Sequence, residues 1–188
     1  MEALPERQEG HARPHLRVVQ VVGYKKSGKT TLACRLIERL AADGLAVGAL
    51  KHDAHDFEPD VPGTDSHRLR LAGARAAAIA SPRRTAWFEE RGEELGELLS
   101  RMSELELDVV IVEGWKREPY PKLALVQQEE DLPILAELSN VLAVVTWNAE
   151  LLERLQRIQG APPGLAYDDI DRIAASVREG AGAFSEKN

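Results

Sequence analysis

The feature that most constrains the fold of this 188-residue chain is a glycine-containing segment between an apolar run and a helical pattern. Residues 23–30 (GYKKSGKT) match the pattern G-x-x-x-x-G-K-[ST]. The preceding run 16–22 (LRVVQVV) is apolar and β-branched, as in a buried strand. Four apolar residues then recur at helical spacing: Leu32, Leu36, Ile37 and Leu40. Strand, tight turn and helix in this order indicate a phosphate-binding loop.

Strand and helix patterns continue to alternate along the chain. The run 45–50 (LAVGAL) gives a second strand, so residues 16–50 form a βαβ unit, which implies parallel pairing. Further strands are predicted at 74–80, 85–89, 107–112, 122–126 and 141–147. Helices are predicted at 64–72, at 93–105 and in two C-terminal segments around Leu155 and Ile173. This alternation predicts an α/β protein with three layers, the P-loop NTPase fold, in which helices flank a mostly parallel sheet.

Composition and length limit the domain organisation and the classes of partner. We expect residues 16–178 to form one nucleotide-binding domain, with flexible segments at 1–15 and 179–188. The net charge of −7 argues against a general nucleic-acid binder, which needs a basic surface. No stretch approaches the ~20 consecutive apolar residues of a membrane span, and the N-terminus does not have the pattern of a signal peptide. The sequence therefore predicts a cytoplasmic protein without a membrane partner.

The residues of the phosphate-binding loop have distinct expected roles. Glycines let consecutive backbone N–H groups face phosphate oxygens, and the following helix adds positive potential from its N-terminus. Lys29 is expected to bridge the outer phosphates, and the Thr30 hydroxyl to ligate Mg²⁺. The nucleotide-binding residues predicted in this loop are Gly23, Lys25, Lys26, Ser27, Gly28, Lys29, Thr30 and Thr31.

Acidic residues at the ends of two other predicted strands complete the expected site. Glu113 follows the apolar run 109–112 (VVIV), and a carboxylate there reaches Mg²⁺ directly or through water. We therefore predict Thr30 and Glu113 as the metal ligands and Glu113 as a catalytic residue. The loop after Lys51 begins at the edge where ligands gather in α/β sheets. In that loop we predict that Asp53 positions the attacking water and that His52 and His55 contact phosphate, rather than a transition metal.

A second set of residues forms a more specific pattern. Its members are Lys51, His52, His55, Asp56, Asp60, Pro62, Gly63, Asp65, Ser66, Leu69, Arg70, Ala72, Gly73, Ala74, Glu113, Gly114 and Lys116. Together with the phosphate-binding loop, these segments resemble the molybdopterin-guanine dinucleotide biosynthesis adaptor family, MobB. The resemblance covers about residues 16–147. Thr64 stands where the family pattern usually has Lys, and His67 where an aromatic residue is usual.

The resemblance implies several properties that the residues alone do not. It implies GTP as the nucleotide, weak GTP hydrolysis and a homodimer. It also implies a helper role beside the molybdopterin guanylyltransferase, which attaches GMP to molybdopterin, with the molybdopterin cofactor itself as a second candidate ligand. Asp65, Ser66, Arg70 and Lys116 are carried over as ligand-binding residues. Without the resemblance, the sequence predicts only a nucleoside triphosphate with Mg²⁺, because residues 146–148 (TWN) at a strand end do not match an N-K-x-D or T-K-x-D guanine motif.

Two other function classes fit parts of the sequence. A P-loop small-molecule kinase or ATP-dependent ligase needs a base and a substrate pocket near the phosphates, which Asp53, Asp65 and Arg70 could supply. A metallochaperone GTPase is suggested only by His52, His55 and His67, in a chain without Cys-rich or His-rich tracts.

Two further expectations concern shape change and assembly. The loop 52–66 is predicted to change shape with phosphate occupancy. The strand 122–126 lies beside Pro119 and Pro121, so we predict that it forms a sheet edge through which two copies pair.

Overall fold

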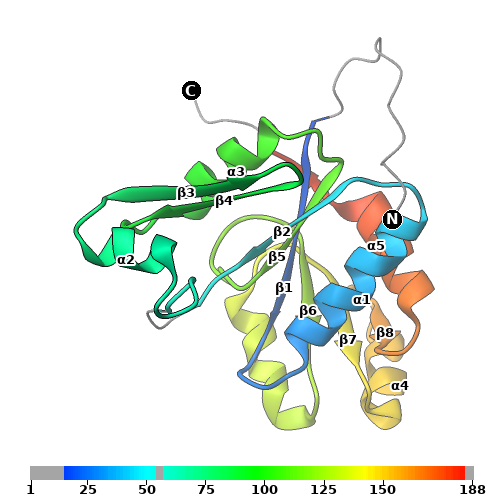
Figure 1. Ribbon diagram of the computed structural model, residues 1–188. Coiled ribbons are helices and arrows are strands. Elements are labelled where there is room, and N and C mark those ends of the chain that lie inside the picture. Colours follow the sequence, from blue (N-terminus) through cyan, green and yellow to red (C-terminus); the bar gives the residue numbers. More distant parts are fainter. Residues whose placement is uncertain (1–14, 54–56, 185–188) are drawn as a thin grey trace.

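The computed structural model describes residues 15–53 and 57–184. The main sheet of these residues has seven strands: β1 (Arg17–Gly23), β2 (Val47–Lys51), β5 (Val109–Glu113), β6 (Lys122–Leu125), β7 (Val141–Thr146), β8 (Gly164–Ala166) and β9 (Gly182–Ala183). Six of them run parallel in the order β2-β5-β1-β6-β7-β8, and β9 pairs antiparallel with the start of β1 (Figure 1). The strand β1 therefore holds the phosphate-binding loop near the middle of the sheet.

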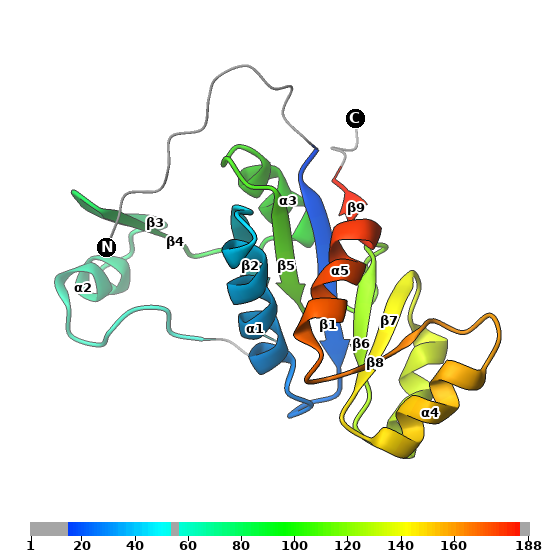
Figure 2. The same cartoon turned by 90° about the vertical axis from the view of Figure 1, so that its right-hand side faces the viewer.

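Helices cover both faces of this sheet, as Figure 2 shows. The helices α1 (Lys29–Ala42) and α5 (Ile170–Gly180) pack on one face. On the other face lie α3 (Leu95–Ser103), the 3₁₀ helix η1 (Glu129–Glu137) and α4 (Ala149–Arg157). Successive strand residues point to opposite faces, so Val109 and Ile111 join the first core while Val110 and Val112 join the second. The predicted three-layer α/β fold with a mostly parallel sheet is confirmed.

An arm projects from this body (Figures 1 and 2). It contains α2 (Asp65–Leu71) and an antiparallel pair, β3 (Ala76–Ser81) and β4 (Arg84–Glu89). At its base, the Glu89 carboxylate accepts hydrogen bonds from Arg101 of α3 at 2.7 Å and from Arg91 at 2.9 Å. These bonds, with a third from Trp87, lower the pKa of Glu89 to about 2. A charged cluster thus links the arm to α3.

One expectation about the sheet edge is wrong. The segment 122–126 was expected to be a free edge, but β6 lies between β1 and β7 and pairs with both. Among the described residues, β2 and β8 end the parallel sheet instead. The apolar pattern of β6 indicates burial on both faces but carries no information on its place in the strand order.

Part of the segment 179–188 belongs to regular structure. The helix α5 extends to Gly180, β9 pairs with β1, and Phe184 is buried in the core beside α3. Only residues 185–188 of the expected flexible tail, and 1–14 of the expected N-terminal segment, lie outside the described residues. In the described part of the chain, no helix combines the length and the apolar character needed to cross a membrane.

Candidate nucleotide-binding site

The segment between β1 and α1 has the backbone of an anion-binding loop. Gly28, just before α1, has φ of +78°, and Lys26 has φ of +64°. Left-handed residues within such a turn create concave nests of backbone N–H groups that bind anions. A Cβ atom at Gly23 would lie 2.7 Å from the Ser27 Oγ and 3.0 Å from the Leu125 carbonyl oxygen. The first glycine is thus required because the backbone passes close to Ser27 of the loop and to Leu125 of the neighbouring strand β6.

Two polar side chains of the loop are suited to bind an anion. Ser27 is only 1% exposed, and its hydroxyl has no hydrogen-bond partner among the described residues. A buried hydroxyl without a partner is unfavourable, and a phosphate oxygen would satisfy it. The Lys29 Nζ donates to the Tyr24 carbonyl at 2.7 Å, across the loop. The loop therefore fits a ligand with several phosphate oxygens.

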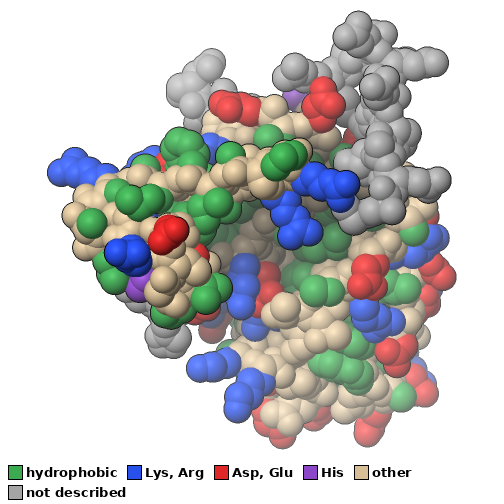
Figure 3. All heavy atoms as spheres, in the orientation of Figure 1, with side chains coloured by type: hydrophobic (Ala, Val, Ile, Leu, Met, Phe, Trp, Pro, Cys, Tyr) green, Lys and Arg blue, Asp and Glu red, His purple; other side chains and the backbone are tan. Residues whose placement is uncertain are grey.

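The charges around Lys29 also favour an anion. Partial burial lowers the pKa of the Lys29 ammonium; the charge of Glu113 opposes this shift, and that of Lys51 adds to it. A bound polyphosphate would bring negative charge to these ammonium groups and would stabilise their charged form. Figure 3 shows that the surface is hollowed beneath the arm and that Lys or Arg side chains lie around this hollow.

The structure brings the two predicted metal ligands together. Because β5 is the neighbour of β1, with Glu113 opposite Val21, the ends of the two strands meet at one edge of the sheet. The Thr30 hydroxyl donates to the Glu113 Oε2 at 2.8 Å. A hydroxyl and a carboxylate oxygen at this spacing are hard ligands suited to Mg²⁺. Their predicted proximity is confirmed, and their role as magnesium ligands stays a prediction.

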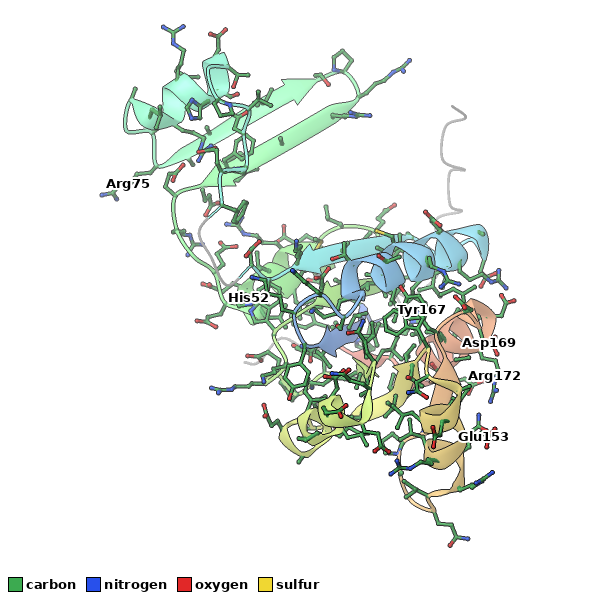
Figure 4. The ribbon with its side chains drawn as sticks, turned by 90° about the horizontal axis from the view of Figure 1, so that it is seen from below. His52, Arg75, Glu153, Tyr167, Asp169 and Arg172 are labelled. Atoms are coloured by element: carbon green, nitrogen blue, oxygen red, sulfur yellow. The ribbon has the colours of Figure 1, made fainter. Side chains whose placement is uncertain are left out.

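The loop after β2 begins beside Glu113. The His52 backbone N–H donates to the Glu113 carbonyl at 2.9 Å, and the His52 ring lies 4.8 Å from the ring of Trp115 (Figure 4 labels His52). Asp53 is the next residue after His52, so it enters the loop at the same edge of the sheet. His55 lies outside the described residues. Among the residues described, no group of three or more His, Cys, Asp or Glu side chains could hold a metal ion.

Three predicted ligand-binding residues lie on the arm. Asp65 pairs with Arg68, the Ser66 hydroxyl lies 3.1 Å from that of Thr64, and Arg70 forms ion pairs at 2.6 and 2.7 Å with two glutamates, Glu58 and Glu90. All three belong to α2, which is apart from the phosphate-binding loop in both Figure 1 and Figure 2. Within this chain, the structure does not bring them to the loop.

Lys116 lies in the segment that follows Glu113. Its Nζ is 2.6 Å from the Glu137 carboxylate of η1, and this hydrogen bond lowers the pKa of Glu137. Lys116 therefore lies on the surface of the body, where it contacts η1 and not the phosphate-binding loop.

Two buried polar residues that the sequence reasoning missed hold the segment 114–121 in place. The Gln20 Nε2 donates to the carbonyls of Gly114 at 2.9 Å and Trp115 at 2.6 Å. Lys122 is fully buried, and its ammonium donates to the carbonyls of Glu118 and Tyr120. Burial lowers the pKa of Lys122. The sequence did contain a signal for both residues, because Gln20 and Lys122 each stand in an otherwise apolar strand. A polar side chain in a buried strand needs hydrogen-bond partners.

Comparison with known proteins identifies the family. The family model described as "MobB: Molybdopterin guanine dinucleotide synthesis protein B" matches residues 18–147. The chain belongs to the MobB family. It is 34% identical over 155 residues, covering 81% of this chain and 87% of the relative, to a probable molybdopterin-guanine dinucleotide biosynthesis adapter protein of Bacillus subtilis (strain 168). It is 44% identical over 103 residues, 53% of this chain and 59% of the relative, to the adapter protein of Escherichia coli (strain K12).

A solved structure confirms the similarity in three dimensions. The crystal structure of Bacillus subtilis MobB superposes with a TM-score of 0.72 at 32% identity, covering 86% of this chain and 98% of that one. The predicted fold and the resemblance to MobB proteins are therefore confirmed.

The two departures of this MobB-family chain from the expected pattern have structural roles in the arm. Thr64 is the N-cap of α2, where its hydroxyl accepts from the His67 N–H at 3.4 Å. The His67 Nδ1 in turn accepts from the Gly63 N–H at 3.3 Å. Both residues thus stabilise the turn before α2, as capping hydroxyls generally do.

An aromatic pair lies on the other side of the phosphate-binding loop from Glu113. Trp147 follows the end of β7 and Tyr167 follows the end of β8, and their rings stack with centroids 4.1 Å apart and planes 12° apart. The Tyr167 hydroxyl donates to the Gly28 carbonyl at 3.4 Å (Figure 4 labels Tyr167). The sequence showed Trp147 at a strand end, but the three-residue strand before Tyr167 is too short to show a period.

Proposed function

We propose that this MobB-family chain binds GTP with Mg²⁺ at residues Gly23–Thr31 and serves as a nucleotide-dependent adapter in molybdopterin-guanine dinucleotide biosynthesis. The observation that carries the proposal is the phosphate-binding loop. The buried Ser27 hydroxyl has no hydrogen-bond partner among the described residues, and three residues later the Thr30 hydroxyl contacts Glu113. The names of the relatives as adapter proteins support the pathway. In this role the protein assists the guanylyltransferase that attaches GMP to molybdopterin.

Each residue of the loop has a physical task in this proposal. Backbone N–H groups and the Ser27 hydroxyl bind phosphate oxygens. Lys29 exchanges its bond with the Tyr24 carbonyl for charge-assisted bonds to the outer phosphates, which are stronger. Thr30 and Glu113 hold Mg²⁺, which when bound neutralises phosphate charge.

Hydrolysis is slow in this proposal. Glu113 is engaged by Thr30, and Asp53 supplies the carboxylate that positions water at the edge of the sheet. We expect intrinsic GTP turnover well below the ~10 s⁻¹ that is typical of metabolic enzymes.

The contacts of Glu113 offer a route from the nucleotide to the surface. Its carboxylate contacts Thr30, and its carbonyl accepts from the His52 N–H at the start of the loop 52–66. The His52 ring contacts Trp115, and the next residue, Lys116, is held by η1. A change in the Thr30–Glu113 contact on nucleotide binding therefore reaches both the loop 52–66 and the surface around Lys116. This surface is the one that we propose to contact the transferase or the anionic pterin.

The proposal includes a homodimer, with the arm in place of the segment 122–126 as the contact. The exposed apolar side chains of the arm support self-association: Leu69, Leu71, Ile79 and Trp87 are all at least 42% exposed. Exposed apolar groups gathered on one part of a surface often mark an interaction site. Analytical ultracentrifugation across micromolar concentrations tests this part, and a monomer throughout would contradict it.

A binding experiment tests the adapter role. The chain is immobilised and titrated with the guanylyltransferase, and separately with molybdopterin, in the presence of GTP, of GDP and of no nucleotide. We expect binding that depends on the nucleotide, and we expect that dependence to be lost in Lys29→Ala. Fast turnover on a small-molecule acceptor, without affinity for the transferase or the pterin, would favour a kinase instead. We expect the protein to act in the cytoplasm.

A further inference from the structure

We infer that the base of the bound nucleotide is a purine that stacks on the exposed face of Trp147, on the side of the phosphate-binding loop opposite Glu113. This inference rests on the proposed nucleotide site and assigns the part of that site that binds the base.

The strand order decides on which side of the loop the base lies. The loop leaves β1, which has β5 on one side and β6, β7 and β8 on the other. The charged groups Lys29, Lys51 and Glu113 act on one another and gather towards β5 and β2. Phosphates with Mg²⁺ belong beside these charges, whereas an uncharged base does not. The nucleotide therefore extends its base towards the ends of β7 and β8, the edge at which ligands bind in α/β sheets.

The aromatic pair at the ends of β7 and β8 leaves one ring accessible. Tyr167 is 6% exposed and Trp147 is 44% exposed. Because the rings are stacked nearly parallel, Tyr167 covers one face of the Trp147 indole. The accessible surface of Trp147 therefore belongs to the parts of the indole that Tyr167 does not cover. A single exposed aromatic residue is ordinary on a protein surface, so position and rigidity carry the inference.

Contacts with the loop and with α1 hold this pair rigidly. A Cβ atom at Gly28 would lie 3.0 Å from the Trp147 Cη2, so the indole edge touches the backbone that binds phosphate. The Arg35 guanidinium lies 5.3 Å from the centre of the Tyr167 ring and donates to the Tyr167 carbonyl at 3.1 Å. A surface fixed before the ligand arrives costs little ordering entropy on binding.

The competing aromatic pair does not offer such a surface. His52 and Trp115 lie on the Glu113 side, with rings tilted by 45°. Trp115 is partly buried against the core beside α3. Its ring therefore serves packing, whereas the Trp147 ring is open.

Stacking on Trp147 explains how the chain holds a base without an N-K-x-D motif. An aromatic face binds the π-face of a base and does not read its hydrogen-bonding edge. The same contact is therefore made by guanine and adenine. The large bicyclic surface of a purine makes fuller use of the indole than a pyrimidine does.

The experiment measures the contribution of the base to affinity separately from that of the phosphates. Calorimetry with Mg²⁺ measures the binding of GTP and of inorganic tripolyphosphate to the wild type, to Trp147→Leu and to the control Leu105→Ala, which removes an exposed apolar side chain between α3 and β5. Leucine at position 147 keeps an apolar cover over Tyr167 but removes the aromatic face. We expect GTP affinity to fall about tenfold in Trp147→Leu, the size of one base–aromatic stack, with tripolyphosphate affinity unchanged. The control should bind both ligands like the wild type.

The outcomes distinguish this inference from the proposed function. Unchanged GTP affinity in Trp147→Leu overturns the base subsite, while wild-type binding of tripolyphosphate leaves the phosphate site standing. Loss of both ligands in that variant assigns Trp147 to loop structure and also overturns the subsite. If the wild type binds neither ligand, the proposed function and the subsite fail together.

A measurement without a change at position 147 guards against misfolding of the variant. In Trp87→Phe/Trp115→Phe, Trp147 is the last of the three tryptophans of the chain. GTP should quench its fluorescence, and tripolyphosphate should quench it less. Equal responses to the two ligands would overturn the inference.

Discussion

Replacement of Gly28 by alanine tests how closely the loop is packed against its surroundings. Gly28 has φ of +78°, and the added methyl group would lie 3.0 and 3.1 Å from two atoms of the Trp147 ring. Gly44, at the other end of α1, has φ of +84° but has no atom within 4 Å of a built Cβ. Gly44→Ala is thus a matched control, because it has the same backbone strain without the contact.

The expected losses of stability follow from the backbone strain and from the contact with the Trp147 ring. A left-handed conformation costs alanine about 1–2 kcal/mol, and the lower entropy of the unfolded chain returns roughly 0.4–1 kcal/mol. Gly44→Ala should therefore lower the free energy of unfolding by about 1 kcal/mol, or Tm by roughly 2–4 °C. Overpacking adds about 1–3 kcal/mol to Gly28→Ala, because the stacked ring must shift, so its Tm should fall by at least roughly 4–8 °C.

Thermal unfolding and nucleotide titration together check the reasoning. We expect Gly28→Ala to be the less stable variant and to lose at least about tenfold in triphosphate affinity, because its backbone forms the loop. Gly44→Ala should bind nucleotide like the wild type. Equal losses of Tm in the two variants, with unchanged affinity in Gly28→Ala, would refute the packing of Trp147 against the loop.

Three further changes probe the charges of the site and the arm. Lys29→Ala should lower triphosphate affinity more than tenfold at an almost unchanged Tm, because a charge-assisted contact is worth about 1.5–3 kcal/mol. Similar affinities of the wild type and Lys29→Ala in titrations would contradict the proposed nucleotide site. Because the pKa of Lys29 lies below its ordinary 10.5, wild-type affinity should also decline as alkaline pH deprotonates it, and the variant should lack that decline. Glu113→Gln should weaken Mg²⁺-dependent binding or hydrolysis more than Mg²⁺-free binding, and equal effects would make Glu113 structural. Glu89 has a folded pKa of about 2 and an ordinary value of 4.5, so its bonds stabilise the folded state above pH 4.5 and are lost as pH falls towards 2. The Tm difference between the wild type and Glu89→Gln should shrink over that range, and a constant difference would contradict the role of the carboxylate.

Local patterns were sufficient to predict the central parts of this fold and site. The G-x-x-x-x-G-K-[ST] match fixed the junction of β1 and α1, and the apolar run before Glu113 predicted that its carboxylate would reach Thr30, as it does at 2.8 Å. Both predictions work because parallel buried strands end at one edge of the sheet. The capping signals at Thr64 and Gly73 located α2, and the turn at 81–82 separated β3 from β4. Apolar spacing located α3, which is long enough to show its period.

Properties set by tertiary structure could not be read from the chain. The burial of β6 between two strands depends on strand order, so its apolar pattern was wrongly taken for an edge. The two-residue β9 is defined only by its pairing with β1. Trp147 and Tyr167 come from segments 20 residues apart that meet only because β7 and β8 are neighbours. The position of Asp65, Ser66 and Arg70 away from the loop depends in the same way on the direction of the arm.

Nucleotide-binding calorimetry tests whether residues Gly23–Thr31 bind a nucleoside triphosphate. The wild-type chain is titrated with GTP, GDP, ATP and ADP, each with and without Mg²⁺, and the titrations are repeated with Lys29→Ala. We expect triphosphates to bind more tightly than diphosphates and Mg²⁺ to strengthen their binding. We expect Lys29→Ala to remove most of the difference in affinity between triphosphates and diphosphates. No binding of any nucleotide, or the same affinities in Lys29→Ala as in the wild type, would contradict it.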